Sequence, residues 1–273
     1  CKINFFNLVH NPDNSIPGYY SSTNDTLVVI EPDYLFDASA IAECFSTKEG
    51  TPSVFFLKRF SYSQKTAEIL KGLAVNHLLD ELIIDTTADK NELLDTFFKE
   101  NLLSLILLDD SAKSNIINDI TGIHLKNIKN IVEQYKDFNI LIEPAFYSAK
   151  YGISGRLDCL IDYGEEKKDI FELKSGKTPP KDLLNTNKFQ VTAYNILLKS
   201  AFDGKRRGSS MIFYSAAKTS PLRNVTNTIF DEKALLKIRN RIISGEHMLS
   251  TGDFRFFKIF STDNFDSLPP YLK

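Results

Sequence analysis

The segment from residue 155 to residue 174 constrains the fold more than any other part of the chain. Residues 155–163 and 169–174 have the apolar and β-branched content of β-strands, and a polar turn, Gly-Glu-Glu-Lys-Lys at 164–168, lies between them. Two strands joined by so short a polar connection pair as an antiparallel hairpin. The sequence therefore predicts a β-sheet that contains this hairpin.

Side chains of the second strand alternate between its two faces. Phe171 and Leu173 are expected to point into an apolar core, whereas Glu172 and Lys174 share the opposite face. Asp158 lies on the first strand, at hairpin distance from Glu172. The pairing of the strands thus predicts that two carboxylates and an ammonium group come together at one place.

Two carboxylates beside a lysine suit a hard divalent cation. Mg²⁺ prefers carboxylate oxygens, keeps several waters and binds substrate phosphates. Such an ion polarises a phosphoryl oxygen and lowers the pKa of a bound water, and a lysine beside it offsets charge in the transition state. Asp158, Glu172 and Lys174 supply the minimum set for phosphodiester hydrolysis. An isolated Glu-x-Lys is more often a pair of solvated surface charges, so the prediction depends on Asp158 and on two polar residues of a later helix.

That helix is predicted at residues 185–200. Gln190 and Tyr194 are four positions apart and therefore lie on one face of it. The chain resembles the RecB-type branch of the PD-(D/E)XK nucleases in three motifs taken in order, Gly-x-x-Asp at 155–158, Glu-x-Lys at 172–174 and Gln-x-x-x-Tyr at 190–194. That branch includes nuclease domains of replication helicase-nucleases and the CRISPR-associated exonucleases. The rest of the chain resembles it only loosely.

The resemblance implies a restriction-endonuclease-like core and a role for each matched residue. It implies that Asp158 and Glu172 bind Mg²⁺ or Mn²⁺, together with the main chain of Leu173. It also implies that Lys174 positions the attacking water. The glutamine and the tyrosine of the third motif would hold the DNA or the catalytic groups.

The same branch carries a Gly-x-x-x-His helix upstream of these motifs. His77 follows Gly72 on a predicted helix and resembles that histidine, with one extra residue between the two. The resemblance implies that His77 is a third metal ligand, whereas a lone histidine on an apolar helix is usually a core or edge residue. Imidazole suits Mn²⁺ better than Mg²⁺. Asp80 and Glu81, later on this helix, are interpreted as a solvated face.

Other charged residues near the motifs are candidates for DNA contact or for support of the site. The net charge of −2 gives no global basic field, but residues 150–207 lean basic, and a local stripe is enough for a nucleic-acid partner. Within that region Lys177 and Arg156 are expected to contact DNA or to support the site. Glu143 precedes the first motif, where the family often has an acid. It is either a support of the site or a charge at a strand end.

The number and spacing of the cysteines indicate which cellular compartment and which metal cofactors can be expected. Cys1, Cys44 and Cys159 are scattered without a Cys-x-x-Cys, which gives no support for a disulfide scaffold or a zinc ribbon. Relatives with an iron-sulfur cluster use four cysteines, so no iron-sulfur cluster is expected here. A reducing, cytoplasmic compartment is expected, because neither a signal peptide nor a membrane-length apolar run is visible. The chain begins with Cys1 instead of Met, which suggests a piece of a longer protein.

The pattern as a whole predicts an α/β protein with a small mixed central sheet flanked by helices and a helical region upstream of it. Residues 1–60 are expected to elaborate the core, and residues 61–273 to form the nuclease domain. The strands are expected near 140–147, 154–163, 169–174 and 209–215. Apolar runs predict helices near 63–84, 92–108, 111–135, 185–200 and 231–249.

The predicted function is a divalent-metal-dependent deoxyribonuclease. By resemblance alone, its substrate is the end of single-stranded DNA, and it acts as an exonuclease in DNA repair or recombination, with a helicase domain or subunit as partner. The alternative is a non-cleaving nucleic-acid-binding or scaffolding subunit of a helicase complex. A nucleotide-binding P-loop at Gly176-Lys177-Thr178 is not supported. The P-loop requires a glycine five residues before Gly176, and that position is Phe171.

Overall fold

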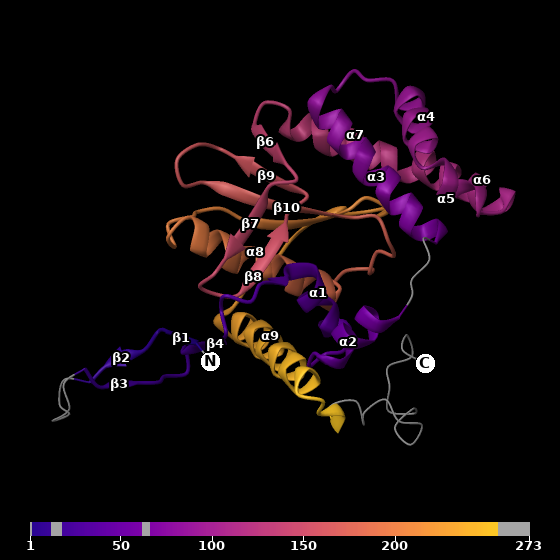
Figure 1. Ribbon diagram of the computed structural model, residues 1–273. Coiled ribbons are helices and arrows are strands. Elements are labelled where there is room, and N and C mark those ends of the chain that lie inside the picture. Colours follow the sequence, from indigo (N-terminus) through magenta and orange to yellow (C-terminus); the bar gives the residue numbers. More distant parts are fainter. Residues whose placement is uncertain (1, 12–17, 62–65, 256–273) are drawn as a thin grey trace.

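A mixed β-sheet lies at the centre of the computed structural model, which describes residues 2–11, 18–61 and 66–255 (Figure 1). In this part of the chain the sheet has five strands in the order β12-β11-β10-β9-β6. β10 runs parallel to β11, and the other neighbours are antiparallel. The strands are β6 (Asn139–Ile142), β9 (Cys159–Asp162), β10 (Lys168–Lys174), β11 (Ser210–Tyr214) and β12 (Leu222–Asn224).

Helices cover both faces of this sheet, so the predicted α/β fold with a small mixed sheet and a helical upstream region is confirmed. None of the helices within the described ranges combines the length and apolar character that a bilayer crossing needs. The helices are α1 (Ala38–Glu43), α2 (Ser53–Phe60), α3 (Ala67–Ile84), α4 (Lys90–Glu100), α5 (Leu102–Ile106), α6 (Asp110–Asp119), α7 (Leu125–Tyr135), α8 (Asn185–Ala201) and α9 (Ile229–Ser250), with a 3₁₀ turn η1 (Cys44–Ser46) and a π turn η2 (Ile120–His124).

The predicted hairpin is present as β9 and β10, with Cys159 opposite Phe171. The strands expected at 154–163 and 140–147 each divide in two, which corrects the prediction. The first becomes β8 (Ile153–Arg156) and β9, and the second becomes β6 and β7 (Ala145–Ser148).

A bend in the paired strands causes both divisions. Pro144 has no amide hydrogen for the ladder, and Glu143 has a left-handed backbone, with φ of 48°. Across the bend, the Glu143 N–H donates to the Asp158 carbonyl at 2.9 Å, and the Leu157 N–H donates to the Pro144 carbonyl at 3.1 Å. The two strands therefore stay paired while they change direction, and β7 and β8 join β5 (Phe36–Asp37) in a separate sheet.

The central sheet separates two hydrophobic cores. Phe171 and Leu173 point to the core beneath α3 and α7, as the alternation along β10 predicts. Ile170 and Ile212 belong to the other core, beneath α8 and α9. β10 is therefore covered on both faces, and Glu172 on its α8 side is only 1% exposed.

The N-terminal residues complete the core beneath α8 and α9. Leu27 and Ala38 are buried within it. The Asp37 side chain caps α1 by accepting from the N–H groups of Ser39 and Ala40, at 2.9 and 3.1 Å. β1 (Ile3–Phe6) pairs with β4 (Leu27–Ile30), and β2 (Val9–His10) pairs with β3 (Tyr20–Ser21) as an arm that projects from the body (Figure 1).

Threonine side chains cap two of the helices. Thr66 caps α3. Thr228 caps α9, and Asp231 completes a capping box three residues later. α8 has no side-chain cap.

A buried arginine joins the N-terminal residues to the rest of the molecule. Arg239 of α9 is fully buried and donates to the carbonyl oxygens of Gly152, Ile30, Glu31 and Tyr34. Burial lowers its pKa to about 10, so the guanidinium stays charged at neutral pH. Gly152 has φ of +65°, and a Cβ there would lie 2.2 Å from the guanidinium. Four carbonyl groups from two segments of chain, residues 30–34 and Gly152, thus depend on one side chain.

The substitution Arg239→Met tests this dependence. It leaves buried carbonyl groups without a donor, each at a cost of about 1–3 kcal/mol, so we expect the free energy of unfolding to fall by at least about 3 kcal/mol. Urea unfolding followed by circular dichroism measures it. Arg241→Met, an exposed position on the same helix, is the matched control and is expected to change stability by less than about 0.5 kcal/mol. Equal effects of the two substitutions would contradict the role given to Arg239.

Candidate active site

The structure brings Asp158, Glu172 and Lys174 together at one end of the hairpin. An Asp158 carboxylate oxygen accepts the main-chain N–H of Leu173 at 2.6 Å. The Lys174 ammonium donates to Glu172 Oε1 at 2.7 Å and to Gln190 Oε1 at 2.8 Å. The Glu172 side chain is 2% exposed, and that of Lys174 is 25% exposed. The group therefore extends from the core to the surface, with the lysine on the open side.

Asp158 reaches β10 because it lies at the bend between β8 and β9. There the ladder between β9 and β10 has ended, so the Asp158 side chain takes the N–H of Leu173 that a strand residue would otherwise bind. The N–H and C=O groups of one strand residue point to the same neighbour. The main-chain carbonyl of Leu173 therefore lies on the Asp158 side of β10, where it could contribute to a metal site.

Gly155 of the first motif allows α8 to approach the bent strand. A Cβ at this position would lie 3.0 Å from the Ala38 side chain and 3.0 Å from the Tyr194 ring, so a larger residue would push α1 and α8 away. The Tyr194 hydroxyl donates to the carbonyl oxygen of Arg156 at 2.9 Å. Close packing at the glycine thus holds the third motif against the first.

Gln190 connects Lys174 to two helices. Its Nε2 donates to the Tyr194 hydroxyl at 2.8 Å and to the Ser39 hydroxyl of α1 at 3.0 Å. With the amide hydrogens engaged there, its oxygen is held toward the Lys174 ammonium. Ser39 was not recognised as a site residue from the sequence, because nothing in its spacing relates it to residues 155–194.

The buried carboxyl groups carry more negative charge than the lysine offsets. Burial, reinforced by the charge of Asp158, raises the pKa of Glu172 to about 8. Burial also raises the pKa of Asp158, against the opposing charge of Lys174. Burial lowers the pKa of Lys174, but the two carboxylates outweigh it and hold that pKa above its usual range. A proton or a cation has to offset the remaining charge, because an unpaired buried charge is costly.

Asp80 of α3 lies beside this group, which corrects its interpretation as part of a solvated helix face. Its side chain is partly buried. Burial, together with the charges of Glu143 and Asp158, raises its pKa to about 7. The packing of α3 on the sheet creates this proximity, and no local spacing in the sequence signals it.

The structure does not bring His77 to the carboxylates. Its ring packs against Phe97 of α4, with the ring centroids 5.7 Å apart. Gly72 lies on the face of α3 next to the end of β10, where a Cβ would meet the Ser175 hydroxyl at 3.2 Å. A step of five residues turns the side chain by about 140° from that face, whereas a step of four would nearly keep it. The extra residue before His77 therefore turns its ring toward α4.

Glu143, Arg156 and Lys177 lie at the surface. Arg156 Nη1 is 3.0 Å from Glu143 Oε2, with side-chain exposures of 64% and 37%, so this pair contributes little to stability. Lys177 is exposed in the loop after β10. All three side chains are within reach of a ligand in solution.

A cleft of about 400 Å³ opens above Lys174 and Gln190. Its floor is the lysine–glutamine pair, and α1, η1, α2 and the start of α8 form its walls. The polar residues of those walls are Ser39, Glu43, Ser46, Lys58, Thr186 and Asn187. The cleft gives a ligand direct access to the lysine.

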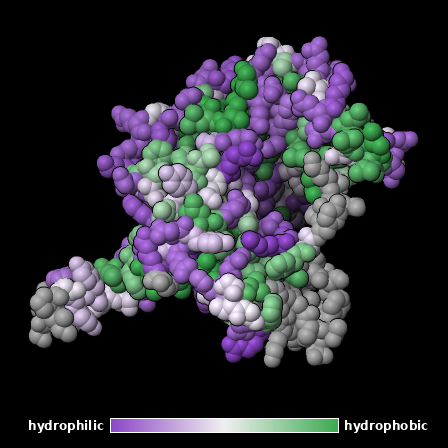
Figure 2. Space-filling view, in the orientation of Figure 1, coloured by the Kyte–Doolittle hydropathy of each residue, from purple (hydrophilic) through white to green (hydrophobic). Residues whose placement is uncertain are grey.

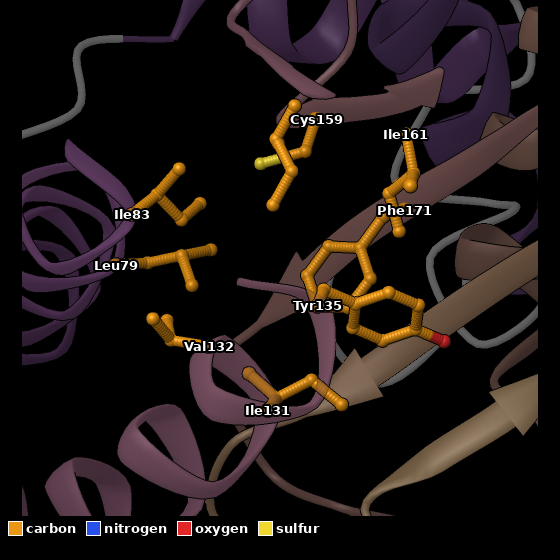
Figure 3. A pocket seen from close by; sticks show the side chains of 9 residues that line it. Leu79, Ile83, Ile131, Val132, Tyr135, Cys159, Ile161 and Phe171 are labelled. Carbon is orange, nitrogen blue, oxygen red and sulfur yellow. The ribbon is translucent and has the colours of Figure 1, made fainter. Parts of the chain in front are cut away.

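A second, much smaller cavity belongs to the core and not to the site. It has a volume of about 20 Å³ and lies between α3, α7 and the sheet. Figure 3 shows the side chains around it, all of them apolar apart from the Tyr135 hydroxyl and the Cys159 thiol. Burial raises the pKa of that thiol well above its usual range, so it stays protonated. Nothing in this lining would orient a polar ligand.

The oxygen donors at the site fit a hard divalent cation. In the described part of the chain, no three His, Cys, Asp or Glu side chains form a ready-made metal site. Glu172 Oε2, however, is buried and has no hydrogen-bond partner among the described residues. It lies beside Asp158, whose carboxylate binds the N–H of Leu173. Two carboxylates and a carbonyl, completed by water, are the ligands that Mg²⁺ and Mn²⁺ accept.

The raised pKa of Glu172 predicts how the metal-free protein responds to pH. Because its folded pKa lies above the ordinary value of 4.5, this carboxyl stabilises the fold fully below about pH 4.5 and loses that contribution as pH rises through about 8. We expect the Glu172→Gln variant to lose less stability than wild type between about pH 5 and 8, by on the order of 1 kcal/mol per pH unit. Urea unfolding in EDTA measures both. Parallel curves for the two proteins would contradict the assignment.

Comparisons with known proteins give distant likenesses to solved structures. No protein-family model matches the chain, and no curated protein matches it by sequence. Among solved structures, it is similar to a protein from Eubacterium rectale that is provisionally named an exonuclease, with 13% identity, a TM-score of 0.47, and coverage of 82% of this chain and 83% of that one. It is also similar to the protein SSO0001, with 16% identity, a TM-score of 0.33, and coverage of 64% and 86%. Likenesses this weak establish neither a family nor an activity.

Proposed function

We propose that this protein is a divalent-metal-dependent nuclease related to the RecB-type branch of the PD-(D/E)XK nucleases. One observation carries the proposal. Glu172 is buried beside Asp158 with only the Lys174 ammonium as counter-charge, and its Oε2 has no partner among the described residues. An unpaired buried carboxylate destabilises a fold, and a bound cation removes this cost by supplying the missing positive charge.

Asp158, Glu172 and the Leu173 carbonyl would hold Mg²⁺ or Mn²⁺. When bound, the ion polarises a phosphoryl oxygen and lowers the pKa of a coordinated water. Asp158 accepts the Leu173 N–H at 2.6 Å, which holds the main chain of β10 beside its carboxylate. Glu172 is buried under α8, and its Oε1 accepts from the Lys174 ammonium at 2.7 Å. These two residues therefore present a rigid pair of oxygen ligands.

Lys174 is the group that meets the reacting phosphate. Its ammonium is held by Glu172 and Gln190 at 2.7 and 2.8 Å and remains partly exposed at the floor of the cleft. A fixed positive charge there stabilises the charge that develops on the phosphate and orients the attacking water. Gln190 and Tyr194 keep the lysine in place through the network that includes Ser39.

The proposed substrate is DNA, cut from single-stranded ends as an exonuclease in repair or recombination, with a helicase domain or subunit as partner. The resemblance in the three motifs supports these finer statements. Arg156 and Lys177 are the proposed strand contacts near the cleft, because both are exposed cations beside the motif strands. The buried free thiols of Cys44 and Cys159 agree with a reducing, cytoplasmic compartment.

The second candidate is a non-cleaving nucleic-acid-binding or scaffolding subunit. Proteins can keep a fold after losing activity, and then the buried charges are no longer required. Here Asp158, Glu172 and Lys174 are all present and in contact. Retaining a costly buried carboxylate favours catalysis over scaffolding.

Cleavage assays on Glu172→Gln and Lys174→Met test the proposal. End-labelled single- and double-stranded DNA is incubated with Mn²⁺, Mg²⁺ or EDTA, and the products are resolved on denaturing gels. We expect wild type to cut only with metal, and each variant to be slower by about 10²-fold or more, because each loses a group that stabilises the transition state.

The matched controls are Glu165→Gln in the exposed hairpin turn and Lys181→Met in the loop after β10, both expected to cut like wild type. A wild-type protein that binds DNA without cutting it under any of these conditions would favour the scaffolding alternative. Cutting that survives both site substitutions would place the activity elsewhere.

Asp80→Asn tests whether the third carboxylate belongs to the metal site. Its pKa of about 7 indicates a strained negative charge that a nearby cation would relieve. We expect the Mn²⁺ concentration for half-maximal cleavage to rise by about tenfold, within the range for groups that support a metal site. Glu81→Gln, one residue later, is the control. An unchanged metal requirement for Asp80→Asn would show that Asp80 acts only through packing.

A further inference from the structure

A second hollow lies at the carboxyl ends of the two parallel strands. Residues 175–180 follow β10 and residues 216–219 follow β11, and these loops wall a hollow of about 580 Å³ together with the start of α3 and the π turn η2. The surface is visibly hollowed between α3 and the end of the sheet (Figure 2). Ligands of open α/β sheets bind outside the carboxyl ends of parallel strands. We call this the strand-end hollow.

The cations of the strand-end hollow outnumber its acids. Both acids, Glu68 and Asp119, are engaged by Lys71, at 2.7 and 3.0 Å. Lys177 and Lys218, in contrast, are exposed on the two loops and make no ion pair with any residue that the structure describes. Two lysines are thus free to bind an anionic ligand.

The rest of the lining adds one more cation and no further acid. Arg223 lies with its guanidinium 4.8 Å from the Tyr214 ring centroid and donates to the Asp182 carbonyl at 2.7 Å, so it is held in place without a carboxylate partner in the described region. His124 is buried at the inner wall, and burial lowers its pKa to about 4, so it is neutral. The hollow is therefore positively charged at neutral pH.

The strand-end hollow adjoins the candidate active site. Ser175, which lines it, directly follows Lys174, and the Ser215 N–H donates to the Lys174 carbonyl at 3.0 Å. Lys177 is three residues beyond Lys174, so the main chain separates them by at most about 11 Å. A strand bound at Lys174 therefore needs only a few more nucleotides to reach Lys177.

The residues that line the strand-end hollow indicate which part of a nucleic acid it contacts. Its polar groups are lysines, an arginine and the hydroxyls of Ser175, Thr178 and Thr219, which suit phosphate oxygens. Its lining in the described part of the chain contains no Phe, Tyr or Trp, and the ring of His124 is buried. Bases would have no ring on which to stack, so recognition falls on the backbone and is independent of sequence.

We propose that the strand-end hollow binds the phosphodiester backbone of the same single-stranded nucleic acid whose phosphate is cut at Glu172 and Lys174, a few nucleotides away. The inference rests on the proposed function and deepens it: Lys177 and Lys218 are the phosphate contacts, and the substrate is a strand longer than a dinucleotide.

The test compares two double variants. Lys177→Gln/Lys218→Gln removes the two contacts, and Lys167→Gln/Lys205→Gln removes two exposed lysines near the opposite end of β10 as the control. Binding of fluorescent dT15 in EDTA is followed by anisotropy between about 50 and 200 mM salt. For the first variant we expect roughly tenfold weaker binding and a slope of log K against log salt that is smaller by about 1.4, since each phosphate contact on a single strand contributes about 0.7. The control keeps the wild-type slope.

Three results would overturn the inference: a wild-type slope in the first variant, no measurable binding of dT15 by wild type, or an equal loss of affinity for dTMP and for dT15. The last would indicate a site for one phosphate and not for a strand. Binding of dA15 is compared with binding of dT15 as a further test. If wild type prefers one of the two and the first variant loses that preference, the hollow contacts bases, which also overturns the inference.

Cleavage by the same proteins with Mn²⁺ separates this inference from the proposed function. Cutting by wild type, together with an unchanged salt slope in the first variant, rejects the strand-end hollow and leaves the nuclease standing. Binding that depends on Lys177 and Lys218, without cutting under any condition, rejects the nuclease and leaves the strand-binding hollow standing.

Discussion

The burial of the Glu172 carboxyl within the sheet is the constraint on which the rest of the site depends. Taking a charge out of water costs several kcal/mol unless partners replace the lost hydration. Here the partner is one lysine on the same strand. The bend at Glu143–Pro144 adds a second carboxylate, Asp158, which binds the Leu173 amide and increases the negative charge beside Glu172. The site is consequently rigid and short of positive charge, and both properties suit a group that must hold a metal ion and a phosphate.

Holding this arrangement requires segments that are far apart in the chain. α8 covers Glu172 and supplies Gln190, while Ser39 of α1 fixes the orientation of the Gln190 amide. α1 in turn belongs to the N-terminal residues whose carbonyl groups Arg239 ties to α9. The N-terminal residues therefore do more than cover the core, because they complete the hydrogen-bond network behind the lysine.

Local periodicity explains what could be predicted from the sequence. Glu172 and Lys174 share a face because strands alternate, and Gln190 and Tyr194 share one because they are a helical turn apart. Asp158 is predicted from hairpin pairing.

Asp80 and Ser39 could not be predicted, because they reach the site through the packing of whole helices, which no short spacing records. The bend at Pro144 was not predicted, because a strand was expected to run through residues 140–147 and the change of direction of two paired strands appears only in the sheet. His77 shows that a motif-like spacing can also suggest a contact that the structure does not make, because one extra residue in the helix turns its ring toward a different neighbour.

The division of the interior by the central sheet has an energetic consequence. Leu82 lies in the core beneath α3 and α7, and Ile242 lies in the core beneath α8 and α9. Because the two side chains belong to separate clusters, their truncations should be thermodynamically independent, and the free-energy changes of the single variants should sum to that of the double variant. Coupling should appear for positions on the central strands β9, β10 and β11, where a residue facing one core is bonded to residues that face the other.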